Sequence, residues 1–413
     1  MTTPGTHTPV STAETGDHFD FDVAVIGAGP SGSRGAQLLA SLGHRVALFE
    51  RDPEPGHPVH CTGIISRECV EQYELPSSII LHGANSFVLR SPRGHAARVR
   101  RKAIQAYIVD RIALDQLLAA RAVEAGATLI TNATVEDVRW TGGGVTLSVA
   151  VTGERRAYRA RVAVLATGHG SPLSRKLGFL PHAEVISGCQ AVVEAPNMPE
   201  VEVFTGQIVG HGGYGWIVPY KTGQALVGVL TRAHTVRYMH GLIQKLQDDG
   251  RIGPIVREFR CRGIPIGLAE RTVVDGIVAV GDVANQVKPT SGGGIYYGML
   301  GAESAAATVH EALAAGDTSA VGLGAYEARW RRTMEREIRT GQTLRHACEQ
   351  LSDGTVERLH WLLRVPGLRR VLTATSPRFD WHSAPLLHVL DRFRRASHAT
   401  GEPPTMQRAR RVS

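Results

Sequence analysis

A chain of 413 residues is too long for a single compact core, so its length predicts two domains or one domain with a large insertion. Apolar residues make up 43% and charged residues 20%, as in ordinary globular proteins, and no stretch reaches the ~20 consecutive apolar residues of a membrane span. The net charge of +8 would suit nucleic acid or an anionic membrane, but residues 388–413, with six arginines against two carboxylates, supply half of it.

The chain opens with residues 1–20, which are rich in threonine, lack the apolar core of a signal peptide and are expected to be disordered. Residues 21–26 are a short apolar run that ends at a glycine, the pattern of a buried parallel strand. A helix over residues 31–42 follows, ended by Gly43, and residues 45–49 form the next strand. This βαβ unit requires a parallel sheet.

Beyond this unit the pattern changes several times. Residues 51–63 are rich in proline, glycine and histidine and predict a loop, whereas residues 111–125 predict an amphipathic helix. The stretch 128–165 alternates polar and apolar residues, as a β-meander does, and ends in a buried strand at 162–165.

Residues 186–268 predict a second, antiparallel β-rich domain with one helix near 236–248. Buried-strand character returns at 276–280, so the first domain is discontinuous in sequence, and the chain is helical after about residue 294. The expected fold class is α/β, with a Rossmann-type nucleotide-binding domain, an inserted β-rich domain and a helical C-terminal region. The expected boundaries are 21–185 and 269–319 for the first domain, 186–268 for the insertion, 320–398 for the helical region and 399–413 for a tail.

The tail, residues 399–413, is basic and has too few apolar residues to form a core, so it is expected to be disordered and solvated. A peripheral contact with anionic lipid is the alternative for this tail. A cytoplasmic protein that touches a membrane at most from one side is therefore expected, with no nucleic-acid partner.

The cysteines are spread along the chain without the paired spacing of a metal site. No Cys-x-x-Cys pair occurs, so the sequence predicts neither a bound metal nor a disulfide framework. Free thiols favour a reducing compartment. The five residues are Cys61, Cys69, Cys189, Cys261 and Cys348.

The turn after the first strand has the spacing of a dinucleotide-binding loop. Gly27 permits a tight turn, Gly29 lets the backbone approach a pyrophosphate, and Gly32 lets the helix pack on the strand. The start of that helix offers unpaired N–H groups and a positive dipole to the phosphates. Glu50, at the end of the second strand, stands where an acid accepts hydrogen bonds from the adenosine ribose. This motif does not choose between NAD and FAD.

A second motif, residues 281–295, favours FAD. Asp282 follows a buried strand and can bind ribityl hydroxyls, and the glycines at 292–294 begin a helix whose N–H groups can face the anionic edge of a flavin. The pattern resembles the C-terminal flavin motif of p-hydroxybenzoate-hydroxylase-like flavoproteins. The alternative is a glycine-rich loop with a structural aspartate.

With these two motifs, three further segments together resemble the geranylgeranyl reductase family of FAD-dependent oxidoreductases: His60-Cys61-Thr62-Gly63, Val109-Asp110-Arg111 and Gly213–Pro219. Members of this family saturate isoprenoid double bonds. The resemblance covers roughly residues 20–310 and implies bound FAD, NAD(P)H or another electron donor, and a lipophilic isoprenoid substrate. Residues 320–413 carry no motif that matches, and the oligomeric state is not indicated.

The resemblance implies a role for each matching residue. Toward FAD, Ser31 and Gly32 would face the pyrophosphate and Glu50 the ribose. The remaining cofactor residues would be Cys61, Thr62 and Gly63 beside the isoalloxazine, Arg111 at the head of its helix, Val135 by the adenine, and Asp282, Gly293, Gly294 and Ile295 at the ribityl chain and ring. Tyr214, Trp216 and Pro219 match the Tyr-x-Trp-x-Phe-Pro signature of the substrate domain, in which Val218 replaces the phenylalanine.

Cys61 and Tyr214 are the candidate proton donors, by position alone. A cysteine beside a glycine is also typical of a small buried side chain. Tyr214 and Trp216 alternate along a strand and share one face, which is typical of packing as well.

The chief alternative is an FAD-dependent monooxygenase that hydroxylates an aromatic or lipophilic substrate on the same fold. Such hydroxylases carry an aspartate where this chain has Thr167 and a histidine where it has Asn285, which favours the reductase. A third hypothesis is a flavin-binding protein without redox turnover. Retention of the phosphate and ribityl positions argues against it.

Overall fold

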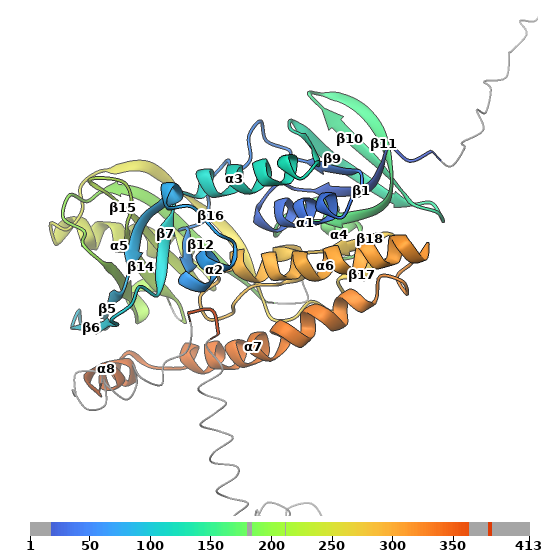
Figure 1. Cartoon of the computed structure of the whole chain (residues 1–413). Helices are drawn as coiled ribbons and strands as arrows, with labels where there is room; N and C mark the ends of the chain where they lie inside the picture. Colours follow the sequence, from blue (N-terminus) through green and yellow to red (C-terminus); the bar gives the residue numbers. More distant parts are fainter. Residues whose placement is uncertain (1–17, 180–183, 211, 363–378, 382–413) are drawn as a thin grey trace, which may run out of the picture.

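The computed structural model describes residues 18–179, 184–210, 212–362 and 379–381. The basic tail, nearly all of the N-terminal segment and most of residues 363–398, for which disorder or helix was expected, lie outside these ranges. Figure 1 shows two large sheets side by side along the long axis of the molecule, with two long helices running beneath them. The predicted α/β class is confirmed.

The larger sheet has eight strands and a parallel centre. Strand β1 lies between β11 and β2, with Val23 opposite both Val162 and Val46. The paired segments at residues 23–26, 46–49 and 162–165 are uninterrupted apolar runs because both faces of the sheet are covered there. The parallel strands are β1 (Phe21–Ile26), β2 (Val46–Phe49), β8 (Thr128–Ile130), β11 (Glu154–Leu165) and β18 (Ile277–Ala279).

An antiparallel arm extends this sheet. β9 (Ala133–Trp140) and β10 (Val145–Val151) pair with the first half of β11, and β17 (Val273–Val274) pairs with β18. The predicted meander is therefore present, except that β8 joins the parallel strands beside β2.

Helices cover the parallel sheet. The predicted first helix is confirmed as α1 (Pro30–Ser41), which packs against α3 (Arg111–Glu124) and α6 (Ile295–Ala315). The close approach of α1 to α6 passes Gly35, where a Cβ would lie 3.8 Å from that of Ala302. Below α6 runs α7 (Ala325–Glu349), whose Tyr326 and Trp330 are fully buried (Figure 1).

The second sheet has seven strands in the order β16-β12-β15-β14-β13-β5-β6. Helix α5 (Thr235–Asp248) covers one face, where Met239 and Leu242 pack against alternate residues of the strands. The strands are β12 (Glu184–Glu194), β13 (Val201–Phe204), β14 (Tyr214–Pro219), β15 (Gln224–Thr231), β16 (Ile255–Ile266), β5 (Ser86–Arg90) and β6 (Ala96–Arg100).

The hairpin β5–β6 differs from the expected domain division. Residues 86–100 fall within the segment assigned to the nucleotide-binding domain, yet β5 pairs in parallel with β13 of the second sheet. A parallel pairing between segments this far apart leaves no local signal in the sequence, since it depends on the connection and not on the strand itself.

The expectation that the cysteines are unpaired is wrong. Cys189 of β12 and Cys261 of β16 lie directly opposite each other in the antiparallel register and form a disulfide, with Cα atoms 4.1 Å apart. The bond joins residues 72 apart in sequence, so no spacing motif marks it. It also removes the basis on which a reducing compartment was expected.

Smaller elements complete the fold. A three-stranded sheet of β3 (Ile64–Ser66), β7 (Ala106–Val109) and β4 (Ile80–Ala84) packs between the large sheets. Short helices are α2 (Arg67–Gln72) and α4 (Pro172–Lys176), and 3-10 turns are η1 (Ser77–Ile79), η2 (Gln207–Val209) and η3 (Gly281–Ala284).

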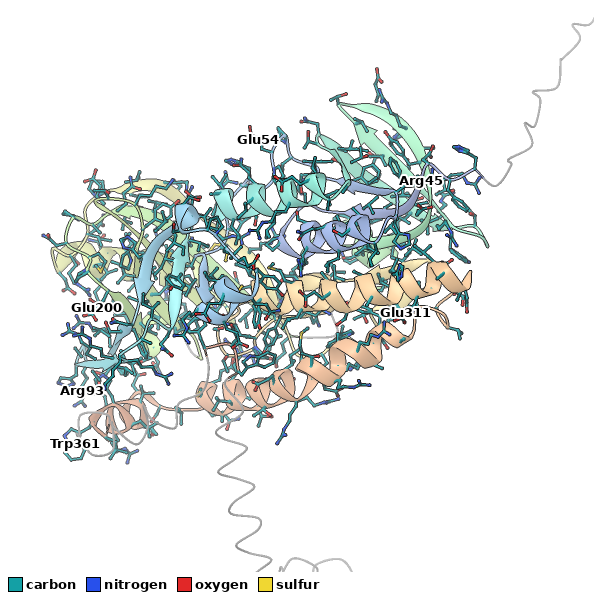
Figure 2. All side chains as sticks on the ribbon, in the orientation of Figure 1. Arg45, Glu54, Arg93, Glu200, Glu311 and Trp361 are labelled. Atoms are coloured by element: carbon teal, nitrogen blue, oxygen red, sulfur yellow. A yellow bond between two sulfur atoms is a disulfide. The ribbon has the colours of Figure 1, made fainter. Side chains whose placement is uncertain are left out.

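At the far end, α8 (Asp353–Leu362) lies under the β5–β6 hairpin. The Arg93 N–H donates to Glu357 over 2.6 Å, and Figure 2 shows Arg93 and Trp361 at this end of the molecule. None of the helices in the described ranges is long and apolar enough to span a bilayer.

Candidate functional site

The turn between β1 and α1 has the geometry that its glycines predict. Gly27 has φ +104°, and a Cβ there would lie 2.5 Å from the carbonyl oxygen of Ala166. A Cβ on Gly32 would overlap the carbonyl of Gly27, so the helix can approach the strand only with glycine here. Gly29, the residue before α1, differs, because a Cβ there would meet nothing within 4 Å. The turn therefore leaves open space at the start of the helix.

Glu50 lies beside this turn. One carboxylate oxygen accepts the N–H of Ala28 over 2.8 Å and the other accepts the N–H of Asp52 over 3.0 Å. These bonds hold the carboxylate at the edge of the turn, where the predicted ribose contact requires it. Val135 lies nearby on β9, since the N–H of Ala133 donates to the Glu50 carbonyl, and its side chain packs in the core.

Replacing Glu50 tests this assignment. Glu50→Ala is expected to weaken FAD binding by about 1–3 kcal/mol, the scale of lost hydrogen bonds to a charged group. Isothermal titration of the apoprotein with FAD measures the change, and Glu54→Ala, an exposed position on the same loop (Figure 2), serves as control. Equal FAD affinity in Glu50→Ala and parent would overturn the role given to Glu50.

The two flavin motifs meet at Ser31. Its Oγ lies 2.7 Å from where a Cβ on Gly281 would stand, and it also touches the position of a Cβ on Gly298 in α6. The Gly281 N–H donates to Gln286 over 2.8 Å, and Gln286 in turn donates to the hydroxyl of Tyr326 from α7 over 2.8 Å. This buried network fixes the second turn against the first. Gln286 was not predicted, because its partners lie in a distant helix.

Asp282 projects from this second turn toward the start of α6. A Cβ on Gly294, the residue before α6, would lie 2.8 Å from Asp282 Oδ1, so a glycine is required there. Burial raises the pKa of Asp282, and the charges of Arg262, His169 and Arg111 act in the opposite direction. Gly293 packs on the aliphatic chain of Lys288, and Ile295 begins α6.

The loop that carries Cys61 reaches the head of α3. Gly63 has φ +74°, and a Cβ there would lie 2.5 Å from the Val109 carbonyl oxygen and 3.0 Å from Arg111 Cγ. The Gly63 N–H donates to Cys61 Sγ over 3.4 Å, and the thiol is exposed. Cys61, Gly63 and Arg111, three of the predicted residues, are thus neighbours.

Arg111 is held by a buried ion pair. Its Nη2 lies 2.7 Å from Asp115 Oδ2, one turn further along α3, and both side chains are almost fully buried. Burial raises the pKa of Asp115 to about 6, although Arg111 opposes the shift. The second guanidinium nitrogen, Nη1, is buried without a hydrogen-bond partner.

The signature strand β14 contacts the second flavin motif. The hydroxyl of Tyr214 donates to the Ser291 carbonyl over 2.6 Å, which ties β14 to the second motif. Burial raises the pKa of Tyr214 to about 12. Pro219 ends the strand and Val218 is fully buried beside Ile108 of β7.

Gln190 of β12 is a site residue that the sequence did not indicate. Its Oε1 accepts the hydroxyl of Thr62 over 2.6 Å and the indole N–H of Trp216 over 3.4 Å. The Cys61–Gly63 loop and the signature strand are therefore joined through one amide. Only the strand order brings residues 62, 190 and 216 together, so no local pattern could have found this link.

Several buried polar atoms around the two motifs have no hydrogen-bond partner within the described part of the protein. They include Arg111 Nη1, Thr167 Oγ1 and Asn285 Nδ2. A group rich in phosphate, hydroxyl and carbonyl oxygens would satisfy such atoms. With the open helix start at Gly29, this arrangement fits FAD. Within the described ranges of the chain, no group of three or more His, Cys, Asp or Glu side chains could hold a metal ion.

Comparison with known proteins agrees with this geometry. Residues 22–176 match the family model described as FAD dependent oxidoreductase, which defines the class of the protein. The chain is 30% identical over 356 residues to the digeranylgeranylglycerophospholipid reductase of Methanocaldococcus jannaschii, covering 82% of this chain and 89% of the relative. The protein belongs to the geranylgeranyl reductase family of FAD-dependent oxidoreductases.

Solved structures share the fold. A geranylgeranyl bacteriochlorophyll reductase-like protein from Thermoplasma acidophilum has a TM-score of 0.78 at 22% identity, covering 89% of this chain and 98% of that one. The p-nitrophenol 4-monooxygenase of Pseudomonas putida has a TM-score of 0.68 at 16% identity, covering 86% and 96%. Fold alone therefore does not separate reductase from hydroxylase.

Proposed function

We propose that the protein reduces carbon–carbon double bonds of a lipophilic isoprenoid. The observation that carries this proposal is the apolar cluster that packs against the second flavin motif. A Cβ on Gly292 would lie 3.1 Å from Ile264 and 3.6 Å from Leu230, two members of a cluster that also includes Tyr214 and Trp216. An isoprenoid chain suits apolar surroundings of this kind because it has little to offer except apolar contact. The named activity of the relative in Methanocaldococcus jannaschii supports the same substrate class.

The chain contributes binding, orientation and a proton. When bound and reduced, FAD supplies the hydride that adds to one alkene carbon, and the other carbon takes a proton. Arg111, Glu50 and Asp282 would hold the cofactor. The link from Thr62 through Gln190 to Trp216 would hold the signature strand β14 in place beside the Cys61–Gly63 loop.

Cys61 is the better of the two candidate proton donors. The Tyr214 proton is already given to the Ser291 carbonyl, and a pKa raised to about 12 keeps that proton in place. The Cys61 sulfur accepts the Gly63 N–H, which orients the thiol and leaves its own proton free to donate. Both roles stay predictions until the variants are measured.

The reaction is tested with reduced holoenzyme under anaerobic conditions. Isoprenoid diphosphates, quinones and isoprenoid lipids are added one at a time, flavin absorbance is followed, and products are analysed by mass spectrometry. Reoxidation of the flavin with a gain of about two mass units per saturated bond supports the reductase. Incorporation of labelled oxygen into product under air would instead identify a hydroxylase. Loss of flavin absorbance on anaerobic addition of NADPH would support NADPH as electron donor.

Replacing the thiol separates the two half-reactions. Cys61→Ser is expected to retain FAD and to be reduced at the parental rate, but to be reoxidised by substrate more slowly, on the order of 10²-fold. Stopped-flow absorbance measures both steps, and Cys348→Ser, an exposed cysteine on α7, is the control. If Cys61→Ser is reoxidised by substrate at the parental rate, Cys61 only packs in the site and does not donate the proton.

A further inference from the structure

The seven-stranded sheet has two faces of different character. Cys189, Val227 and Ile217 point toward α5 and form the core beneath that helix. The alternate residues point the other way, since successive side chains of a strand lie on opposite faces. Gln190 is on this second face and accepts a hydrogen bond from Thr62, so the second face is the one turned toward the Cys61–Gly63 loop.

Register pairs assign whole rows to the flavin-side face. One row joins Arg260 to Gln190, then to Gly228, then to Trp216. The next row joins Arg262 to Gly188, Leu230 and Tyr214 through the same strands. Each row is therefore aromatic at β14 and cationic at β16, the edge strand of the sheet.

The apolar end of these rows belongs to the cluster that packs against the second flavin motif. The cationic end is unlike an ordinary solvated strand edge. Arg260 and Arg262 are exposed, stand on the same face about 7 Å apart along the strand, and neither has an ion pair or hydrogen bond with another described residue.

The Arg262 guanidinium lies against the flavin-binding domain. Arg262 Nη2 is 2.7 Å from where a Cβ on Gly168 would stand, beyond the carboxyl end of β11. The adjacent Gly263 would place a Cβ 2.9 Å from His169. On this side the carboxylate of Asp282 is close enough to Arg262 for the guanidinium charge to lower its pKa, against the effect of burial.

His60 completes the group. It precedes Cys61, and its Nδ1 is buried without a hydrogen-bond partner. Burial lowers the pKa of His60, and the charges of Arg262, Arg260 and Arg51 lower it further, whereas Asp52 acts in the opposite direction. An uncharged imidazole with a free ring nitrogen can donate a hydrogen bond to an anion without adding a third repelling charge.

We propose that Arg260, Arg262 and His60 form a subsite for the phosphate or diphosphate headgroup of an amphiphilic isoprenoid substrate, whose chain lies across the rows toward Trp216 and Tyr214. The inference rests on the proposed function for the reaction and adds the substrate's anionic end. Planar guanidinium groups match phosphate oxygens in pairs, and an anion between them relieves their repulsion. The distance from β16 to β14, three strand spacings or about 14 Å, is spanned by the chain.

The test uses holoprotein and the variants Arg260→Gln, Arg262→Gln and the double substitution. Arg237→Gln is the matched control, because Arg237 is an exposed arginine on α5, which covers the opposite face of the same sheet. Calorimetry measures binding of a fully saturated analogue of geranylgeranyl diphosphate and of its neutral alcohol, neither of which can be reduced. FAD content and NADPH binding are measured in parallel.

The double variant is expected to bind the diphosphate roughly ten- to a hundredfold more weakly and the alcohol within about twofold of the parent. FAD content is expected to stay at the parental level, and Arg237→Gln to match the parent throughout. Equal weakening for alcohol and diphosphate, or none for either, overturns the subsite. Loss of FAD, or weaker binding of NADPH alone, would assign the arginines to the cofactor or to the donor instead.

This design keeps the two proposals apart. If the unsaturated diphosphate fails to reoxidise the reduced parent protein while arginine-dependent binding of the analogue persists, the proposed reaction is wrong and the subsite stands. If the unsaturated alcohol and diphosphate are both reduced, and the arginine variants bind both as tightly as the parent does, the reaction stands and the subsite is wrong.

Discussion

Gly29→Val is expected to yield a folded protein that binds no FAD. The backbone at Gly29 has φ −71° and ψ −179°, which any residue adopts, and a Cβ there meets nothing within 4 Å. A valine therefore fits the protein itself but fills the space at the start of α1 where a pyrophosphate would lie. Loss of only two charge-assisted hydrogen bonds from the helix start already amounts to roughly 3–6 kcal/mol.

Two further glycines make this result interpretable. Gly143→Val is the control for adding valine to an open, exposed glycine, because a Cβ at Gly143 also meets nothing and the residue lies in the β9–β10 turn. It should stay yellow. Gly32→Val should instead fail to fold, since its Cβ would overlap the Gly27 carbonyl. Flavin absorbance and far-ultraviolet circular dichroism measure the outcomes, and a yellow Gly29→Val protein would show that the first motif has been misread.

What the sequence predicted well is what depends on consecutive residues. The turn at Gly27–Gly32 and the turn at Gly281–Asp282 each follow a buried strand, and each needs glycine for a reason internal to the turn. Periodicity likewise placed α1, α3 and α5 to within a few residues. These features are encoded locally, so a single sequence is enough to read them.

What the sequence did not predict depends on strand order. Gln190 becomes a site residue only because β12 lies between β16 and β15. The Cys189–Cys261 disulfide and the hairpin at residues 86–100 arise in the same way, from pairings between distant segments. Arg260 and Arg262 read as routine charges of an exposed strand until the register shows which face they share with Trp216.

The C-terminal segment gives a further case. Lys288, in the second flavin motif, pairs with Asp380 over 2.6 Å, and the two side chains are 8% and 2% exposed. The Tyr297 hydroxyl donates to the Asp380 carbonyl over 2.9 Å, and Trp381 packs against the Tyr297 ring with centroids 5.5 Å apart. Residues 379–381 are thus anchored to the flavin motif and to α6, although nothing in the sequence of this region matched the family.

Breaking this pair is expected to have the largest effect on stability. Lys288→Met would leave the Asp380 carboxylate buried without its cation, at a loss of about 3–5 kcal/mol in the free energy of unfolding. Asp380→Leu would leave the Lys288 ammonium group buried without its anion, at a similar loss in the free energy of unfolding. The double variant should lose much less than the sum, since replacing both charges by apolar groups removes the uncompensated charge as well as the attraction.

The parent, the two single variants and the double variant form a double-mutant cycle. Denaturant unfolding of each holoprotein, followed by circular dichroism and flavin fluorescence, measures its free energy of unfolding. Lys245→Met is the control, because the Lys245–Asp249 pair at the end of α5 is 41% and 43% exposed. Its loss should change the free energy of unfolding by less than about 1 kcal/mol. If the Lys288 and Asp380 substitutions each cost no more than the control and simply add, the buried pair does not anchor the segment. Strong coupling with weakened FAD binding in the single variants would show that residues 379–381 hold the second flavin motif in place.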